Sequence, residues 1–220
     1  MECASQCHEG LANWAQAELW ARRVSERYAP NATYFWFFWC KRTGKGDVRA
    51  AQQLLADQLQ QPGAPRNNDD HLCQAALWAF AGEPRKAAEA MQPIVASGQS
   101  PFCNFLVVLF LDEAGETRRR DQALKALDPK NPYKPLADFF VASLAKGEAA
   151  AVDLVAAENI LKAMPLTERR NSYYFLGRFL ELRGQQKAAR DYYQRRLAEE
   201  PFSNQVTTAL AGSRLHTEDK

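Results

Sequence analysis

The chain has 220 residues, of which 46% are hydrophobic and 11% are aromatic, and its 28 Lys and Arg against 26 Asp and Glu give a formal net charge of +2. This composition excludes a disordered chain, and the near balance of charge gives no field that would indicate binding to nucleic acid or to a membrane surface. The longest apolar runs have seven residues. A helix needs about 20 to span a bilayer, so no membrane span is expected.

The N-terminal part of the chain, residues 1–32, is predicted to form one amphipathic helix over residues 11–28, which Pro30 would end. Its inward face is expected to consist of Leu11, Trp14, Ala15, Leu19 and Val24. No Lys or Arg precedes Arg22, and no apolar stretch of signal-peptide length is present. We therefore expect no signal peptide and a cytoplasmic location; the alternative is an export signal that was removed and replaced by Met1.

A glycine followed directly by Asp, Glu or Gln recurs along the rest of the chain, at spacings of 36, 33, 32 and 37 residues. The glycines are Gly46, Gly82, Gly115, Gly147 and Gly184. Each ends one apolar periodic run, which is typical of a left-handed glycine at a helix C-terminus. The polar residue that follows suits the positive end of the next helix. The spacing therefore predicts a repeated unit of helix, tight turn and helix.

Proline residues mark the far end of each unit. They are Pro62, Pro101, Pro129, Pro165 and Pro201. Because proline cannot continue a helix, these positions limit the second helix of each unit to about four turns. Pro93 is expected to bend or end the second helix of its own unit early.

Apolar patterns within the units favour helices over strands. The aromatic run at residues 34–39 covers every side of a short helix, which predicts a helix that is buried all round or partly covers a partner. Residues 105–111 would suit a buried strand by composition, but they precede Gly115 where the other units have a helix. A helix is therefore predicted there. Residues 202–215 are expected to form a last, capping helix.

Residues 173–201 show the repeated unit most clearly. Small and large residues follow one another in the order Leu176, Gly177, Leu180, Gly184, Ala189, Tyr193, Leu197 and Pro201. Gly177 and Ala189 would let two helices approach closely, whereas Arg196 stands where a small residue is usual. This segment resembles the tetratricopeptide repeat family, whose unit is a pair of antiparallel helices of about 34 residues.

The resemblance implies an all-α fold, an α-α superhelix of antiparallel helix pairs that occupies residues 1–220 as one array. It would consist of the N-terminal helix in residues 1–32, about five helix-turn-helix repeats in residues 33–201 and the capping helix in residues 202–215. The likeness is specific in residues 173–201 and degenerate in the other units.

In this family the first helix of each unit lines a concave groove that binds an extended peptide or a partner helix. By register, the resemblance implies groove positions at Phe37, Cys40, Leu72, Cys73, Ala76, Phe105, Leu109, Ala137, Asp138, Val141, Tyr174 and Arg178. From these we take as partner-binding residues Phe37, Phe105, Leu109, Val141, Tyr174 and Arg178. The set lacks the basic pattern with which chaperone-binding members hold carboxylates. In a tightly curled array these mostly apolar side chains would instead meet one another, and both interpretations stay open.

No motif of the form GxxxxGK[ST], HExxH, GxSxG or GxGxxG occurs, and the three histidines lie far apart in sequence, so neither an enzyme nor a cofactor is expected. Residues 67–71 could suggest a metal or acid–base cluster, but Asn and Asp before an apolar run favour a helix N-cap. Arg118, Arg119 and Arg120 could grip phosphate, yet they are expected on a solvated helix face.

Five cysteines cannot all pair with one another, and their density is far below that of a disulfide scaffold. Cys40, Cys73 and Cys103 lie in or beside apolar stretches and are expected to be buried. Cys3, Cys7 and His8 could hold a metal ion, although a structural zinc site needs a fourth ligand.

Three hypotheses for function follow. The first is a non-enzymatic scaffold or adaptor that binds a protein or peptide through an apolar and aromatic surface. The second is a repeat segment that supports or regulates a catalytic or envelope module of a larger protein or complex. The third is a metal or redox protein that uses Cys3, Cys7 and His8.

Overall fold

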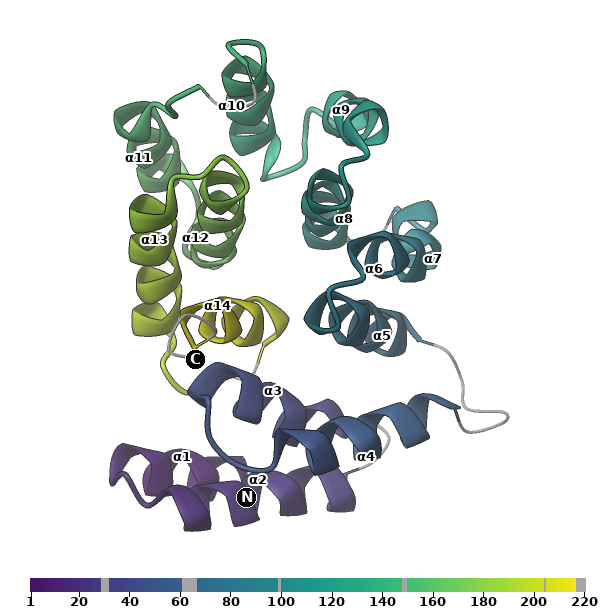
Figure 1. The fold of residues 1–220 in the computed structure, drawn as a ribbon, viewed down its shortest axis with the longest axis vertical. Helices are drawn as coiled ribbons and strands as arrows, with labels where there is room; N and C mark the ends of the chain where they lie inside the picture. The colour runs from purple at the N-terminus through teal and green to yellow at the C-terminus, as the bar shows by residue number, and fades with distance from the viewer. Residues whose placement is uncertain (29–31, 61–66, 99, 148–149, 204, 217–220) are drawn as a thin grey trace.

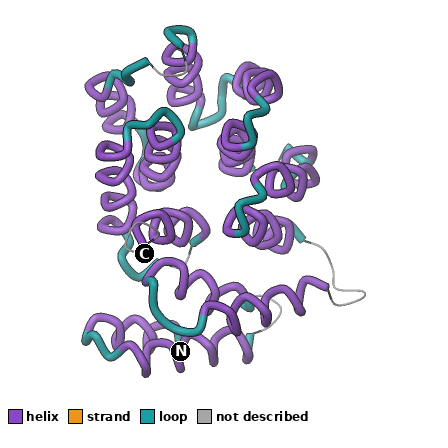
Figure 2. The backbone as a smooth tube through the Cα atoms, in the orientation of Figure 1, coloured by secondary structure: helices purple, strands orange, loops and turns teal. Residues whose placement is uncertain are grey.

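The computed structural model describes residues 1–28, 32–60, 67–98, 100–147, 150–203 and 205–216. Within these ranges the secondary structure consists of helices alone, as Figures 1 and 2 show, and the all-α class is confirmed. The helices are α1 (Glu2–Gly10), α2 (Trp14–Arg27), α3 (Tyr34–Thr43), α4 (Val48–Gln60), α5 (Asn68–Phe80), α6 (Pro84–Ala90), α7 (Gln92–Ala96), α8 (Pro101–Glu113), α9 (Thr117–Ala126), α10 (Lys134–Leu144), α11 (Leu154–Ala163), α12 (Leu166–Glu181), α13 (Gln186–Glu199) and α14 (Val206–His216). The predicted positions Pro30 and Pro62 lie outside the described residues.

The five turn glycines all have the left-handed backbone that their spacing predicts, with φ between 71° and 114°. Each stands between two helices, so the chain between residues 34 and 199 consists of α3 with α4, α5 with α6 and α7, α8 with α9, α10 with α11, and α12 with α13. Pro93 divides the second helix of its unit, as expected, because α6 ends at Ala90 and α7 begins at Gln92. This arrangement is consistent with a helical repeat.

Local signals also fix where individual helices begin. The Asn67 side chain accepts a hydrogen bond from the Asp70 amide at 2.9 Å, and the Asp70 carboxylate accepts one from the Asn67 amide at 3.4 Å. This capping box starts α5 and confirms the predicted N-cap. Residues 105–111 lie in α8 and are all buried, so the prediction of a helix there is also confirmed.

The prediction for the N-terminal region was wrong in two respects. Residues 1–32 contain two helices, because the chain turns at Ala12, whose φ is 55°. The side of α2 that faces inward carries Ala17, Ala21 and Val24, whereas Leu11, Trp14, Ala15 and Leu19 are exposed. Small residues are needed on this side because α2 packs against both α1 and α3.

The pair α12 and α13 packs as its small residues predict. A Cβ atom on Gly177 would lie 2.7 Å from the Tyr193 ring and 3.2 Å from the Ala189 carbonyl oxygen. Arg196, which departs from the family pattern, is fully buried, and its Nε donates to the Thr207 hydroxyl at 3.1 Å. The arginine therefore joins α13 to α14.

The helices follow a curved course that returns on itself, so that α14 lies beside α3 (Figure 1). Arg42, near the end of α3, connects three parts of the chain there. Its guanidinium donates to the Glu9 carboxylate of α1 at 2.6 and 2.7 Å and also to the Pro201 carbonyl. Its own carbonyl accepts from Nε2 of His216, 3.0 Å away, at the end of α14. The helix expected over residues 202–215 thus contacts the beginning of the array as well as its last pair.

Candidate binding surfaces

Most of the predicted partner-binding residues lie in the interior. Five have exposed fractions of 5% or less, namely Phe37, Phe105, Leu109, Tyr174 and Arg178, and Val141 is half-buried. The Phe105 ring stacks on Phe175 with centroids 4.8 Å apart, which joins α8 to α12 across the array. In this conformation the side chains meet one another, which is the second of the two interpretations that the sequence leaves open. A partner cannot reach buried atoms, so contact surfaces have to be sought elsewhere.

Arg178 belongs to an ion-pair network that fills the space between α8, α12 and α14. Its guanidinium lies 2.5 Å from the Glu113 carboxylate and 2.7 Å from Glu181, and Arg214 lies 2.9 Å from Glu113. Burial lowers the pKa of Arg178, but the two carboxylates outweigh that effect and leave the pKa raised. The network keeps the Arg178 guanidinium charged and links α8, α12 and α14.

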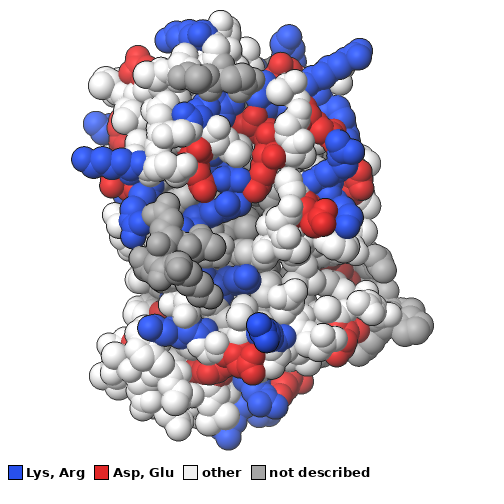
Figure 3. Space-filling model, in the orientation of Figure 1, with Lys and Arg blue, Asp and Glu red and all other residues white. Residues whose placement is uncertain are grey.

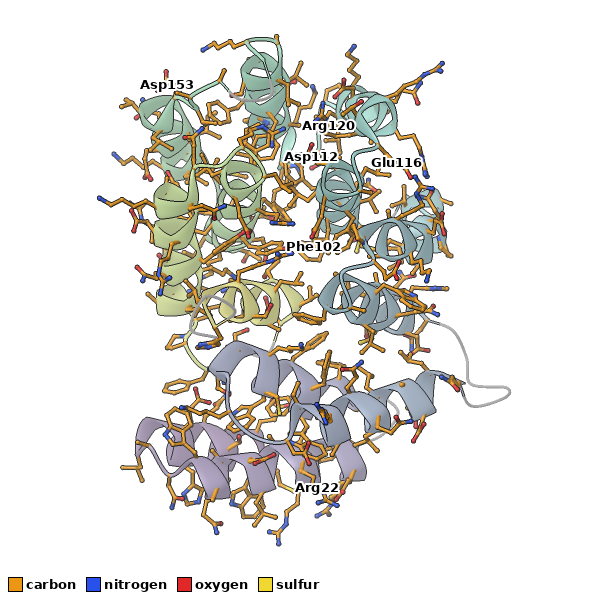
Figure 4. The ribbon with its side chains drawn as sticks, in the orientation of Figure 1. Arg22, Phe102, Asp112, Glu116, Arg120 and Asp153 are labelled. Carbon is orange, nitrogen blue, oxygen red and sulfur yellow. The ribbon has the colours of Figure 1, made fainter. Side chains whose placement is uncertain are left out.

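A second network is centred on Asp112, at the end of α8. Its two carboxylate oxygens lie 2.5 Å from Arg120 and 2.9 Å from Arg183, and Figure 4 shows Asp112 and Arg120 pointing toward one another. The prediction of a solvated face for the arginine run holds for Arg118 and Arg119 and was wrong for Arg120, which is 2% exposed. Arg120 can be buried because the turn at Gly115 brings the Asp112 carboxylate beside its guanidinium.

Among the described residues, two sizeable cavities lie at opposite ends of α3 and α5. The first, of about 500 Å³, is called here the aromatic cavity. It is lined by Glu2, Gln6, Tyr34, Phe35, Phe38, Asp69, Leu72, Cys73, Phe102, Thr167, Asn171, Phe202, Ser203, Gln205, Val206 and Thr207. These residues come from α1, from the N-terminal ends of α3, α5, α8, α12 and α14, and from the segment that precedes α14. Leu72 and Cys73 were among the groove positions implied by the family resemblance.

The aromatic cavity combines accessible rings with negative charge. Tyr34 and Phe102 are half-buried and Phe202 is 38% exposed. Figure 4 places Phe102 near the centre of the molecule. Glu2 and Asp69 are exposed at its rim, and its lining contains no Lys or Arg among the described residues. Burial raises the pKa of the Tyr34 phenol, and the negative charges of Asp69 and Glu2 raise it further.

The second cavity, of about 740 Å³, is called here the basic cavity. It is lined by Cys40, Lys41, Thr43, Gly44, Lys45, Gly46, Val48, Ala79, Phe80, Gly82, Glu113, Leu210, Ser213, Arg214 and His216. It lies at the C-terminal ends of α3, α5 and α14. On the face that Figure 3 shows, basic and acidic side chains are interspersed.

Cys3 and Cys7 are exposed on α1, and Cys40, Cys73 and Cys103 are buried as expected. Burial raises the pKa of the Cys40 and Cys73 thiols, which disfavours their reactive thiolate form. In the described part of the chain, no group of three or more His, Cys, Asp or Glu side chains is placed to hold a metal ion.

No helix among the described residues combines the length and apolar character that a bilayer crossing requires. Searches of protein-family models, of curated proteins and of solved structures found no match to this chain. The tetratricopeptide resemblance therefore stays a prediction from the residues in 173–201 and from the turn spacing.

Proposed function

We propose that this chain is a non-enzymatic scaffold of the tetratricopeptide type that binds a segment of a partner protein in the aromatic cavity. The repeated left-handed glycines and the close approach at Gly177 support a repeat of this type. The cavity lies at the N-terminal ends of α3, α5, α8 and α12, each of which is the first helix of its unit.

The observation that carries the proposal is the accessibility of the aromatic lining. Large aromatic side chains that remain partly exposed in a cavity of this size supply most of the binding energy when a partner side chain covers them. The two carboxylates at the rim add a preference for positive charge, because complementary charges favour the correct partner. The expected ligand is a peptide in which an apolar or aromatic residue stands next to Lys or Arg.

Selection of peptides from a displayed random library on the full chain tests this proposal. The affinity of a selected peptide is then measured by fluorescence anisotropy for the wild type and for Phe102→Ala, Asp69→Asn and Val155→Ala. Phe102 and Asp69 line the cavity, whereas Val155 is 73% exposed on α11, away from it. Asp69→Asn should leave the start of α5 intact, because the capping box there is formed by Asn67 and Asp70.

Phe102→Ala is expected to weaken binding about tenfold or more, since an aromatic contact in a desolvated pocket is worth about 2 kcal/mol. Asp69→Asn should weaken only peptides that carry Lys or Arg, and the loss should shrink as salt is added. Val155→Ala should bind as the wild type does. Selected peptides that bind all three variants equally well would refute this site.

A further inference from the structure

An exposed stripe of residues runs along the outer side of α2, which is the side turned away from its contacts with α1 and α3. Residues four positions apart share one face of a helix, and the stripe consists of Ala15, Leu19, Arg23 and Arg27. All four are exposed, and together they are called here the α2 stripe. Its first half is apolar and its second half is basic.

The turn that leads into α2 adds to the apolar half. Leu11 is 77% exposed, and Trp14, the first residue of the helix, is 39% exposed. Residues 10–17 contain no charged side chain. Figure 1 shows this turn at the lower left of the molecule, and the same corner of Figure 3 is mostly white, the colour of residues other than Lys, Arg, Asp and Glu. The side chains that the sequence placed in the interior thus form an exposed apolar corner.

Backbone contacts hold this corner in place. Ala12 has a φ of 55°, a conformation that costs energy for a residue with a Cβ atom. Its amide donates to the Glu9 carbonyl at 2.9 Å, and the Asn13 amide donates to the His8 carbonyl at 2.8 Å. The Asn13 side chain also caps α2. Because the turn is fixed by these bonds, Leu11 stays in an exposed position.

The basic half of the α2 stripe keeps its charge because the two carboxylates of α2 have other partners. Glu26 forms an ion pair with Arg22 at 2.7 Å. Glu18 accepts a hydrogen bond from the Trp36 indole at 3.2 Å, on the inner side of the helix. In the described part of the chain, neither arginine of the stripe forms an ion pair with a carboxylate. The stripe therefore offers two positive charges next to its apolar half.

This division of charge decides between possible occupants. Two copies of the chain that met through the stripe in parallel would bring like charges together. Two copies in antiparallel contact would set the arginines of each against the apolar half of the other, where they would lose water without gaining a counter-charge. A membrane surface with anionic lipids offers phosphates directly beside an apolar layer, so it suits both halves of the stripe.

We propose that the α2 stripe, together with Leu11 and Trp14, docks this protein on a membrane surface that contains anionic lipids. Leu11, Trp14 and Leu19 enter the boundary between headgroups and acyl chains, and the two arginines contact lipid phosphates. The net charge of +2 does not indicate this site, because acidic residues on other helices balance the basic ones. The described lining of the aromatic cavity contains no residue of α2, so the inference goes beyond the proposed function.

Flotation of the full chain with vesicles on a density gradient, at low salt, tests this surface. One set of vesicles contains phosphatidylcholine alone, and the other also contains phosphatidylserine. The double variant Leu11→Gln with Leu19→Gln removes the apolar contacts, and Arg23→Gln with Arg27→Gln removes the charges. The four residues are exposed, so both variants should keep the wild-type circular dichroism spectrum.

Two further double variants are matched controls. Val155 and Leu154 on α11 are 73% and 38% exposed, close to the 77% and 37% of the leucines in the apolar variant, and both are changed to Gln. Lys162 and Lys187 are exposed on α11 and α13, and their change to Gln removes as much charge as the arginine variant does. The controls therefore separate an effect of the α2 stripe from a general effect of composition.

We expect the wild type to bind vesicles with phosphatidylserine, and to bind vesicles of phosphatidylcholine alone about tenfold more weakly. Each variant of the stripe should lose about tenfold in binding to the anionic vesicles, both controls should bind as the wild type does, and added salt should weaken binding.

Absence of binding to the anionic vesicles would overturn the proposal and indicate a protein as the occupant. Equal losses in the stripe variants and the controls would also overturn it. Sedimentation velocity covers the remaining occupant. A wild-type dimer that is lost in Leu11→Gln with Leu19→Gln would contradict the proposal, because a second copy would then cover the stripe.

Discussion

Buried charges in the interior are held by carboxylates at the end of α8. The Asp112 side chain is 7% exposed and contacts two buried guanidiniums, those of Arg120 and Arg183. A charge removed from water is tolerated only when a close opposite charge and hydrogen bonds replace the water. Loss of one charged residue of this network should therefore destabilise the fold far more than loss of one residue of an exposed ion pair with a similar N–O distance.

Asp112→Asn should lower the free energy of unfolding by about 3–5 kcal/mol, because both arginines lose this counter-charge while they remain buried. Urea denaturation of the purified variant measures the loss. Glu116→Gln is the matched control, since Glu116 pairs with Arg85 and Arg119, which are 65% and 46% exposed, and water can replace the carboxylate there. Equal losses in the two variants would show that the Asp112 network does not stabilise the interior.

Gly177→Ala tests the close packing of α12 on α13. The added methyl group would lie 2.7 Å from the Tyr193 ring and should cost about 1–3 kcal/mol, the usual effect of overpacking a core. Gly10→Ala is the control, because its Cβ would lie at an ordinary 3.8 Å from Phe202. A Gly177→Ala protein as stable as the wild type in thermal unfolding would contradict the predicted approach of the two helices.

At the scale of elements, the contact between α14 and α3 decides which surfaces the array exposes. A Cβ atom on Gly212 would lie 2.5 Å from the Arg42 carbonyl oxygen, and the atoms in the way are backbone atoms that cannot rotate aside. The two helices can approach this closely only because residue 212 is glycine. Their contact, together with α13 and α5, brings the last helix back to the beginning of the array.

Gly212→Ala should therefore separate α14 from α3. Hydrogen exchange followed by mass spectrometry should show faster exchange in residues 206–216 and in 34–43, while α9 and α11 keep their wild-type rates. Faster exchange spread evenly over all helices would indicate general destabilisation. Unchanged exchange in α14 would mean that its contact with α3 is not the one described.

At the scale of the whole molecule, the sequence predicts what is local and misses what depends on the curvature of the array. The turn at Gly115 and the cap at Asn67 are determined by a few neighbouring residues, so their positions follow from spacing and residue type. Helix α1 carries little apolar pattern and is held by packing against α2, so no local signal predicted it.

The candidate binding residues show the same difference between features that are local in sequence and features that depend on the course of the whole chain. The register of the repeats assigns Phe105 to the first helix of its unit, which is α8, but only the return of the chain reveals that Phe175 covers its ring. The aromatic cavity joins Glu2, Asp69 and Phe202, which are separated by most of the chain. Such a set cannot be read from one sequence, because its members share no spacing.

Partners are proposed to bind at the aromatic cavity and not through the buried residues that the repeat register indicates. Hydrogen exchange of the full chain with and without a library-selected peptide tests this claim directly, because it locates the bound segment. We expect slower exchange in residues 2–10, 34–38, 68–73 and 101–104, with no change in α4, α9, α11 and α13. Slower exchange confined to those four outer helices would contradict the proposed site.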